Sequence, residues 1–362
     1  MKVMQIMPEF GLAGAERMCE ALCLGLKEAG DEVRAVSFFD YRSVITDNLE
    51  AAKIQVDYLG KKMGLDLAIV PRLRAAFMSF KPDIIHTHRY CLKYVQFALR
   101  TTTLCTVCVH TVHNVAEHEL SNADKRPQGF FFRRKWAVPV AISPLVRDSI
   151  EQLYLLDPDD VPMIFNGVSR CFPPRDRHDD EFKFLHIGRY TSVKNHELLV
   201  KAFSLARKSN PRISLDLVGT GELFETIKEL IAELGLEDSV HQVGLIDDVT
   251  PCFAKADAFV LPSNYEGMPI SLVEAQAAGL PSIVTPVGGV PDVVSEGVEA
   301  LYCKPTVDSV AHSLLMLAGD AALTKRMGAA ALANSMRFTQ KSMTDQYRTL
   351  YKSLISSEAN DD

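Results

Sequence analysis

Several features are missing from this sequence, and each absence removes a class of protein. No uninterrupted apolar run reaches about 18 residues, so the sequence predicts no membrane-spanning helix. Basic residues are not in excess: 39 Lys and Arg against 46 Asp and Glu give a formal net charge of −7, which argues against nucleic acid as a partner. Eight cysteines scattered through 362 residues do not make the dense pattern of a disulfide-stabilised secreted protein.

The first residues, MKVMQIMPEF, lack the long apolar core of a signal peptide. We therefore expect a cytoplasmic protein, with peripheral contact to the inner face of the cell membrane left open. Cys105 and Cys108 form a C-x-x-C spacing, but they lie in LCTVCVHTV, which is typical of a buried strand. We expect these two thiols to pack in the interior and to have no redox or metal role.

Short runs rich in Val, Ile and Leu alternate with segments of helical period, a pattern typical of α/β proteins with parallel sheets covered by helices. The pattern runs once from KVMQIM to VPMIF and starts again at FKFLHIG. Between them, RCFPPRDRHDDE has the composition of a linker, which we place at Arg170–Glu181. We expect an N-terminal domain over 1–170, a C-terminal domain over 171–338, and a C-terminal helix and tail over 339–362 that packs on the N-terminal domain.

Two basic residues follow the first strand of the second half, in LHIGRYTSVKN. Arg189 is predicted just past the strand and Lys194 in the first turn of the next helix. A lysine is unfavourable there, because the helix N-terminus already carries partial positive charge, unless a bound anion joins the two. A planar Arg fork and a Lys point charge suit a diphosphate, although two solvated charges are the alternative.

Two glutamates stand out in SNYEGMPISLVEAQAAGLP. Glu266 is predicted in a loop, where it can accept hydrogen bonds from hydroxyls while the backbone N–H groups near Ile270 and Ser271 face a phosphate. Glu274 is predicted in the following helix. Ser271 and Glu274 also match a capping box, S-x-x-E, so a purely structural role for Glu274 stays open.

These motifs, together with the GAER that follows the first strand, resemble family 4 retaining glycosyltransferases of the GT-B fold, especially those that assemble bacterial capsule and exopolysaccharide. The similarity covers nearly the whole chain, including DIIHTH, TVHN, AISPLV and FNGV. The resemblance implies two Rossmann-like domains whose parallel sheets face each other across a cleft. It also implies a nucleotide-diphosphate sugar, UDP-linked, as donor, and no metal or other cofactor.

The resemblance assigns roles to single residues as well. It implies that Arg189 and Lys194 hold the donor diphosphate. Glu266 would contact the transferred sugar and Glu274 the ribose hydroxyls, with His113 of TVHN near the donor sugar. The usual double glycine before GAER reads Leu12-Ala13-Gly14 here, so only Gly14 is carried over. The predicted catalytic residues are His113 and Glu266, and the predicted donor-binding residues are Gly14, Arg189, Lys194, Ile246, Gly267, Met268, Ile270, Ser271 and Glu274.

Histidines near the strand ends of the first half are further candidates. His86 and His88 alternate on one strand and are expected on opposite sides, with His88 facing the cleft. His110, His113, Glu117 and His118 also suggest a metal site, which the intervening Thr and Asn residues disfavour, so no metal ligand is predicted.

Between Lys125 and Arg147 there are six basic residues and no acidic one, centred on GFFFRRKW. Aromatics interleaved with Lys and Arg suit an interface with anionic lipid or a lipid-diphosphate acceptor. A helix with an apolar core face and a solvated basic face is the alternative. The acceptor or membrane candidates are His88, Arg133, Arg134, Lys135 and Trp136.

The sequence therefore predicts a retaining glycosyltransferase that moves a sugar from a nucleotide-diphosphate donor to a saccharide acceptor, lipid-linked, in cell-surface polysaccharide assembly. A nucleotide-sugar epimerase of similar architecture and a non-catalytic donor-binding subunit are the alternatives. A dinucleotide oxidoreductase is disfavoured, because no G-x-G-x-x-G follows the first strand.

Overall fold

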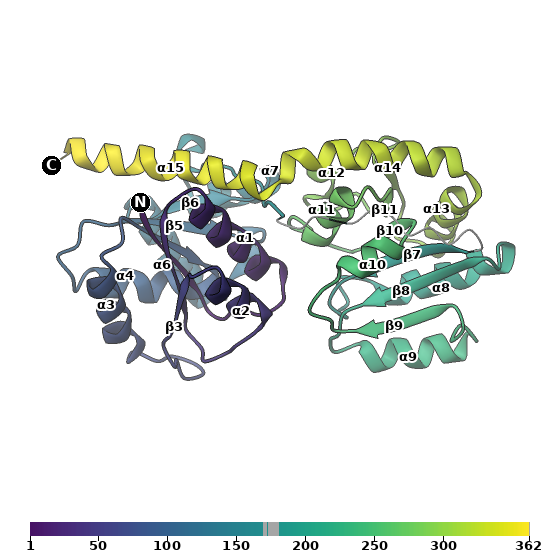
Figure 1. The fold of residues 1–362 in the computed structure, drawn as a ribbon, viewed down its shortest axis with the longest axis horizontal. Coiled ribbons are helices and arrows are strands. Elements are labelled where there is room, and N and C mark those ends of the chain that lie inside the picture. The colour runs from purple at the N-terminus through teal and green to yellow at the C-terminus, as the bar shows by residue number, and fades with distance from the viewer. Residues whose placement is uncertain (169–171, 173–180, 362) are drawn as a thin grey trace. The chain divides into compact units, whose positions relative to one another are not determined.

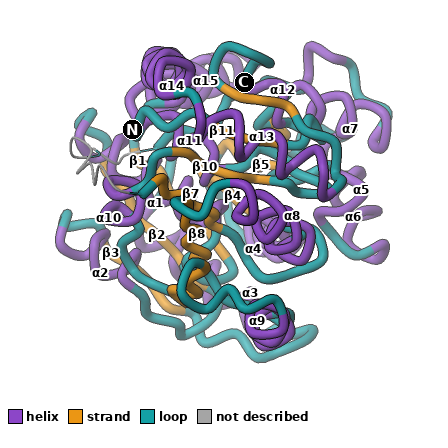
Figure 2. The backbone as a smooth tube through the Cα atoms, turned by 90° about the vertical axis from the view of Figure 1, so that its right-hand side faces the viewer, coloured by secondary structure: helices purple, strands orange, loops and turns teal. Residues whose placement is uncertain are grey.

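The computed structural model describes residues 1–168, 172 and 181–361, and the chain divides into two compact units (Figure 1). Unit 1 comprises Met1–Ser169 with Thr339–Asp362, and unit 2 comprises Arg170–Phe338. The predicted linker Arg170–Glu181 lies outside the described residues, apart from Phe172 and Glu181. Helices and strands alternate along the chain in both units. Figure 2 shows the strands in orange and the helices in purple.

Unit 1 contains a six-stranded sheet of order β3-β2-β1-β4-β5-β6, in which every neighbouring pair is parallel. The strand order reverses after β3, and right-handed crossovers therefore put α1 and α2 on one face and α3, α4 and α6 on the other. The strands are β1 (Lys2–Met7), β2 (Glu32–Ser37), β3 (Gln55–Tyr58), β4 (Ile84–His88), β5 (Val107–Val112) and β6 (Val138–Ala141).

The helices of unit 1 come from both ends of the sequence. They are α1 (Gly14–Glu28), α2 (Val44–Ala51), α3 (Ile69–Phe80), α4 (Leu92–Leu99), α5 (Ala116–Glu119), α6 (Asn122–Arg133), α7 (Pro144–Tyr154) and α15 (Gln340–Asp361), with short 3-10 turns at Arg89–Cys91 and Pro158–Asp160. Helix α15 packs on α1 (Figure 1). Its Met343, Tyr347 and Tyr351 side chains are buried in the same core as Val3 and Met7 of β1. The last helix thus completes the hydrophobic core of the first domain.

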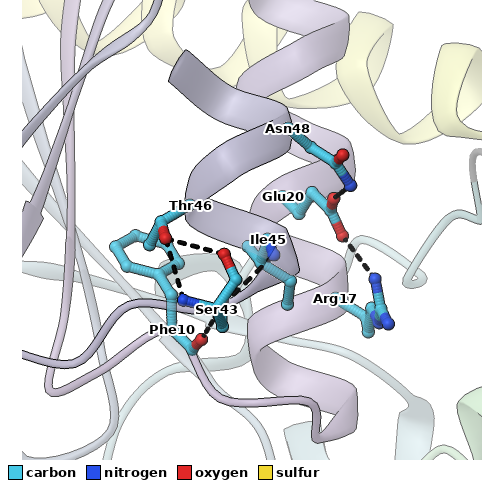
Figure 3. Close-up of polar contacts among 7 residues, drawn as sticks. All are labelled: Phe10, Arg17, Glu20, Ser43, Ile45, Thr46 and Asn48. Atoms are coloured by element: carbon cyan, nitrogen blue, oxygen red, sulfur yellow. Dashed lines mark hydrogen bonds and ion pairs between the residues drawn. The ribbon is translucent and has the colours of Figure 1, made fainter. Parts of the chain in front are cut away.

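Polar contacts fix α1 and α2 beside the loop that follows β1 (Figure 3). The Ser43 hydroxyl donates to the carbonyl of Phe10 at 2.5 Å and accepts from the Ile45 N–H at 3.2 Å, which caps the start of α2. Asn48 of α2 donates to Glu20 of α1 at 2.7 Å. These contacts hold the residues just before Gly14, which begins α1.

Unit 2 repeats the same topology with a sheet of order β12-β11-β10-β7-β8-β9, again parallel throughout. Its strands are β7 (Phe182–Ile187), β8 (Ile213–Val218), β9 (Val240–Gly244), β10 (Ala258–Leu261), β11 (Ser282–Val284) and β12 (Ala300–Tyr302). Its helices are α8 (His196–Ser209), α9 (Phe224–Glu233), α10 (Thr250–Lys255), α11 (Ile270–Ala277), α12 (Val290–Val293), α13 (Val307–Gly319) and α14 (Ala321–Ser335), followed by a 3-10 turn at Met336–Phe338. The two parallel sheets confirm the predicted α/β architecture.

Three local predictions are wrong. The segment VPMIF is not a strand; Met163 makes only an isolated bridge with Ala141. Cys105 is exposed and precedes β5, whereas Cys108 is buried in that strand, so the predicted strand began too early. Lys194 lies two residues before α8, whose N-cap is Asn195 in a left-handed conformation with φ of 56°. The unfavourable interaction of a first-turn lysine with the helix dipole therefore does not arise.

Candidate active site

The strand order of unit 2 reverses between β7 and β10, which are neighbours in the sheet. In open parallel sheets, ligands bind beyond the carboxyl ends of the strands at such a reversal. The chain leaves β7 through Gly188 and Arg189 toward Lys194, and it leaves β10 toward Glu266. The predicted diphosphate and sugar residues therefore flank this position.

Lys194 and Glu266 form an ion pair, with Nζ 2.6 Å from Oε1. The same carboxylate oxygen accepts a hydrogen bond from the Ser263 hydroxyl at 2.5 Å. Glu266 is 7% exposed and Lys194 is partly buried. An ammonium group fixed in this way by a buried carboxylate is a preorganised positive charge beyond the carboxyl end of β7.

Asn264 joins the two loops that carry this pair. Its backbone N–H donates to the carbonyl of Val193 at 2.8 Å, and its side-chain nitrogen donates to the carbonyl of Ser192 at 2.9 Å. On the other side, the Gly289 N–H donates to the carbonyl of Glu266 at 3.1 Å. Gly288 has φ of +57°, and a Cβ atom there would lie 1.7 Å from the Glu266 carbonyl oxygen. The loop that carries Glu266 is thus held at Asn264 on one side and at the Glu266 carbonyl on the other, and the second contact requires a glycine at position 288.

Helix α11 begins at Ile270, with Pro269 as its N-cap and no side-chain cap. The Leu272 and Val273 N–H groups donate to the Pro269 carbonyl, so those of Ile270 and Ser271 precede the first intrahelical bonds, as expected for an anion-binding helix start. Ser271 and Glu274 are the second and fifth residues of the helix, so the alternative of a capping box is wrong. Glu274 is 8% exposed, a buried position that capping does not explain.

The other predicted donor residues lie in the loops around this pair. Arg189 is exposed and follows β7 by two residues, as Ile246 follows β9. Gly267 and Met268 connect Glu266 to the start of α11, where the Met268 side chain is buried. All of these positions lie beyond the carboxyl ends of their strands.

In unit 1 the predicted residues His88 and His113 are brought together. His88 ends β4 and His113 follows β5, its neighbour in the sheet, and the His88 Nδ1 and His113 Nε2 atoms are 2.9 Å apart. The expectation that His86 and His88 face opposite sides is wrong: their rings share one face, with centroids 4.4 Å apart. Residues two apart on a strand necessarily point to the same side.

Burial sets the ionisation of this group. It lowers the pKa values of His86 and His88 well below the usual value and that of His113 to about 3, so all three rings are neutral near pH 7. The Glu119 carboxylate accepts the His113 backbone N–H at 2.9 Å, and burial raises the Glu119 pKa to about 8. The cluster of His86, His88 and His113 therefore presents uncharged hydrogen-bonding groups at the carboxyl ends of β4 and β5.

Gly14 is the first residue of α1, at the same edge of the sheet as His88. Arg89 follows His88 in a left-handed conformation with φ of 53°, and its guanidinium lies 3.2 Å from the Glu16 carboxylate in the first turn of α1. The loop after β4 is thereby linked to the start of α1.

The basic aromatic segment lies at the opposite edge of the unit 1 sheet from His88. It ends α6 and leads to the amino end of β6, with Phe131 and Phe132 buried and Arg133, Arg134 and Lys135 exposed. Lys135 pairs with Asp160 at 2.8 Å, and the Arg100 guanidinium stacks over the half-buried Trp136 ring. The structure thus separates His88 from the other four acceptor or membrane candidates.

Sequence reasoning missed three residues at these sites: Ser263, Glu119 and Gln5. Gln5 is fully buried in β1 and contacts His88, with the His88 Nε2 atom 2.9 Å from its Oε1 atom. A single amide within the apolar run KVMQIM was the available signal. Within the described part of the chain, no group of three or more His, Cys, Asp or Glu side chains is arranged to hold a metal ion.

Two six-stranded parallel sheets of one topology match the fold of GT-B glycosyltransferases. HepE of Anabaena, solved in complex with UDP and glucose, matches this fold with a TM-score of 0.85 at 18% identity, covering 98% of this chain and 100% of that one. A glycosyltransferase from Rickettsia africae matches with a TM-score of 0.81 at 20% identity, covering 98% of each chain.

The chain belongs to the family described as Glycosyl transferases group 1, which matches residues 172–352, and residues 12–170 match Glycosyltransferase Family 4. The predicted family and the assignment as a transferase are thereby confirmed. N-acetyl-alpha-D-glucosaminyl L-malate synthase of Bacillus anthracis is 26% identical over 313 residues, which are 82% of this chain and 81% of that protein. Putative glycosyltransferase EpsF of Bacillus subtilis is 29% identical over 252 residues, 65% of this chain and 64% of that protein. None of the helices within the described residues is both long and apolar enough to span a membrane.

Proposed function

We propose that this glycosyltransferase moves a sugar, with retention of configuration, from a UDP-linked donor to a saccharide acceptor in cell-surface polysaccharide assembly, without a metal ion. The observation that carries the donor assignment is the Lys194–Glu266 ion pair at the reversal between β7 and β10. HepE was solved with UDP and UDP-glucose, which supports a uridine nucleotide, and the similarity to EpsF supports a polysaccharide role.

In this proposal the charges of unit 2 stabilise the leaving diphosphate. Lys194 and Arg189 bind its oxygens, and the N-terminus of α11 adds the backbone N–H groups of Ile270 and Ser271. Glu274 binds the ribose hydroxyls, while Ile246, Gly267 and Met268 line the nucleotide. Glu266 and His113 are assigned to the transferred sugar, whose anomeric carbon gains positive charge as the diphosphate departs.

The donor assignment is tested by binding of UDP, ADP and GDP in the presence of EDTA, measured by calorimetry and by thermal shift. UDP at 100 times its dissociation constant should add roughly 2.7 kcal/mol of stability. Lys194→Ala and Arg189→Ala should each weaken UDP binding by roughly 1.5–3 kcal/mol, the worth of a charged hydrogen bond. Lys201→Ala is the matched control, because Lys201 makes an exposed ion pair with Glu197 at 2.6 Å on α8. Loss of UDP binding in EDTA, or equal binding by Lys194→Ala, would refute this assignment.

A lipid-linked acceptor and peripheral membrane contact form the second part of the proposal. Their support is the surface formed by Phe97, Phe130, Arg133, Arg134 and Lys135, in which Phe97 is 56% and Phe130 is 41% exposed beside three exposed basic residues. Aromatic and cationic side chains together suit anionic lipid headgroups.

Liposome co-sedimentation tests the membrane part separately. Changing Arg133, Arg134 and Lys135 to Ser should reduce binding to anionic liposomes, most strongly at low salt, where surface attraction is unscreened. Changing the exposed residues Lys201, Lys208 and Lys228 of unit 2 to Ser alters the net charge equally and should leave binding unchanged. If the variant with Arg133, Arg134 and Lys135 changed to Ser sediments as the parent does, membrane contact is refuted and these residues form a solvated basic helix face.

A further inference from the structure

A chain of hydrogen bonds buried in unit 1 runs from β1 to the end of β5. The Gln5 Oε1 atom lies 2.9 Å from His88 Nε2, and His88 Nδ1 lies 2.9 Å from His113 Nε2. Gln5 and His88 are fully buried. Each ring nitrogen of His88 has one partner, so the position of the His88 proton sets the direction of both hydrogen bonds.

The Gln5 amide defines that direction. Its oxygen faces two hydrogen donors, the His88 ring at 2.9 Å and the Cys19 thiol at 4.0 Å, and an amide oxygen can only accept. The His88 proton therefore resides on Nε2, which leaves the Nδ1 atom of this neutral ring as an acceptor. His113 must then carry its own proton on Nε2 and donate it to His88.

Helix α15 fixes the amide from the other side. The Gln5 nitrogen donates to the Tyr351 hydroxyl oxygen at 3.5 Å, and that hydroxyl lies 2.7 Å from His86 Nδ1. Burial raises the pKa of Tyr351, so the phenol keeps its proton and donates it to His86, whose Nε2 atom bonds Thr111 at 2.7 Å. Reversal of the Gln5 amide would require all of these bonds to reverse together.

The hydrogen-bonded chain ends at the His113 Nδ1 atom. His113 Nδ1 is enclosed and has no hydrogen-bond partner among the described residues. The His113 backbone N–H is held by Glu119, which fixes the loop that carries the ring. A neutral imidazole held in this way presents a lone pair and no proton, so its natural partner is a hydroxyl group of a ligand.

We propose that Gln5 and His88 are positioning residues that hold His113 in the Nε2–H tautomer, so that its Nδ1 atom accepts a hydrogen bond from a hydroxyl of the transferred sugar. The sugar as partner rests on the proposed function, whereas the tautomer does not. We call Gln5, His88 and His113 the relay. In this proposal Gln5 and His88 belong to the site without touching the ligand, and His113 acts as a hydrogen-bond acceptor and not as an acid.

The tautomer is measured directly on ligand-free protein with ¹⁵N-labelled histidine, by two-bond ¹⁵N–¹H correlation spectra that distinguish the protonated from the unprotonated ring nitrogen. His113→Asn identifies the His113 signals by their loss. The expected result is a protonated Nε2 and an unprotonated Nδ1 near pH 7. A proton on Nδ1 in the parent protein would overturn the proposal without reference to any substrate.

Variants then test the relay. Gln5→Leu and His88→Leu should give His113 a mixture of tautomers, whereas His88→Asn supplies an amide oxygen near the Nδ1 position and should restore the Nε2–H form. His110→Asn is the control, because His110 is a buried ring on β5 that bonds Thr87 and lies outside the relay. If His88→Leu does not fold, the His113 tautomer measured in Gln5→Leu tests the relay alone. An unchanged tautomer in the leucine variants would overturn the relay.

UDP and UDP-glucose serve as binding probes. UDP-glucose should shift the His113 Nδ1 signal and UDP should not, and His88→Leu should weaken UDP-glucose about tenfold more than UDP, since a hydrogen bond to the sugar is lost. His88→Asn should stay within about threefold of the parent. If UDP-glucose binds without shifting Nδ1, the hydroxyl contact is refuted. If neither probe binds, the proposed donor fails, while the ligand-free tautomer still decides the relay.

Discussion

In unit 2 the groups at the junction of β7 and β10 carry full charges, whereas in unit 1 the cluster of Gln5, His88 and His113 is neutral and the Arg89–Glu16 ion pair follows it at the end of β4. Lys194 and Glu266 form a 2.6 Å ion pair, while His88 and His113 share one proton across 2.9 Å. The sheets have the same topology, so the difference comes from the side chains alone. A charged junction suits a phosphate, and a neutral one suits the orientation of hydroxyl groups.

The largest expected effect is a difference in acid sensitivity between the two units. Burial lowers the pKa values of four histidines in unit 1 (86, 88, 110 and 113) and of two in unit 2 (186 and 196). A histidine with a lowered pKa in the folded chain stays unprotonated at pH values at which the same histidine in the unfolded chain binds a proton. The contribution of these histidines to the free energy of unfolding is therefore fully present above about pH 6.5. It falls as the pH drops toward 3, by about 1.4 kcal/mol per pH unit for each fully shifted histidine.

Trp136 is the sole tryptophan and lies in unit 1, so its fluorescence reports that unit, whereas far-ultraviolet circular dichroism reports both. In an acid titration the fluorescence change should occur at higher pH than the second half of the circular dichroism change. Coincident transitions would show that the two interiors are equally sensitive.

Gly288→Ala should damage unit 2 and leave unit 1 intact. The new Cβ atom would lie 1.7 Å from the Glu266 carbonyl oxygen at a backbone φ of +57°. We expect a loss of roughly 2–4 kcal/mol of stability from strain and overpacking, together with loss of UDP binding. Gly297→Ala separates the two causes, because Gly297 has φ of +73° and open space around it. It should lose only about 1–2 kcal/mol and keep UDP binding. Comparable damage in both variants would refute the steric explanation.

Glu274→Gln tests whether the charge of Glu274 in α11 matters. Pro269 is the N-cap, so no cap is lost and the melting temperature should change little. UDP binding should weaken about tenfold, because an amide loses roughly 1.5 kcal/mol of charged hydrogen bonding to the ribose hydroxyls. Glu274→Ala should reduce both stability and binding. Parent-like UDP affinity in the Gln variant would remove Glu274 from the donor site.

Glu119 provides the most specific test, because its carboxyl group accepts the backbone N–H of His113 in the neutral site of unit 1. Its pKa is raised to about 8, so the folded chain keeps a proton that the unfolded chain loses, and this group lowers stability as the pH rises from about 4.5 to 8. Glu119→Gln should therefore gain stability over the parent as the pH rises from about 4.5 to 8, by at most about 1.4 kcal/mol per pH unit, with no gain below pH 4.5. The exposed neighbour Glu117, changed to Gln, should show no such gain. Parallel pH profiles for parent and Glu119→Gln would mean that Glu119 is ionised in the native protein.

The sequence allowed the alternation of strands and helices, the two parallel sheets and the residues at the junction of unit 2 to be predicted, because each depends on short-range patterns. Local boundaries were less secure: α8 starts after Lys194 because Asn195 adopts a left-handed conformation, and Pro269 replaces Ser271 at the start of α11. The histidine relay was beyond sequence reasoning. Gln5 is 83 residues from His88 and 346 from Tyr351, and no local pattern links such positions.

The packing of α15 in unit 1 has a consequence for biosynthesis. The first domain begins to leave the ribosome early, yet Met343, Tyr347 and Tyr351 of its core are translated only after all of Arg170–Phe338. Until then the nascent chain exposes the apolar surface of α1 and leaves the Gln5 amide without Tyr351, whereas unit 2 is already complete in sequence. Domains usually fold in the order of their synthesis, from the N-terminus. Here the second-made domain can mature first, and the nascent first domain is the part that chaperones would have to shield.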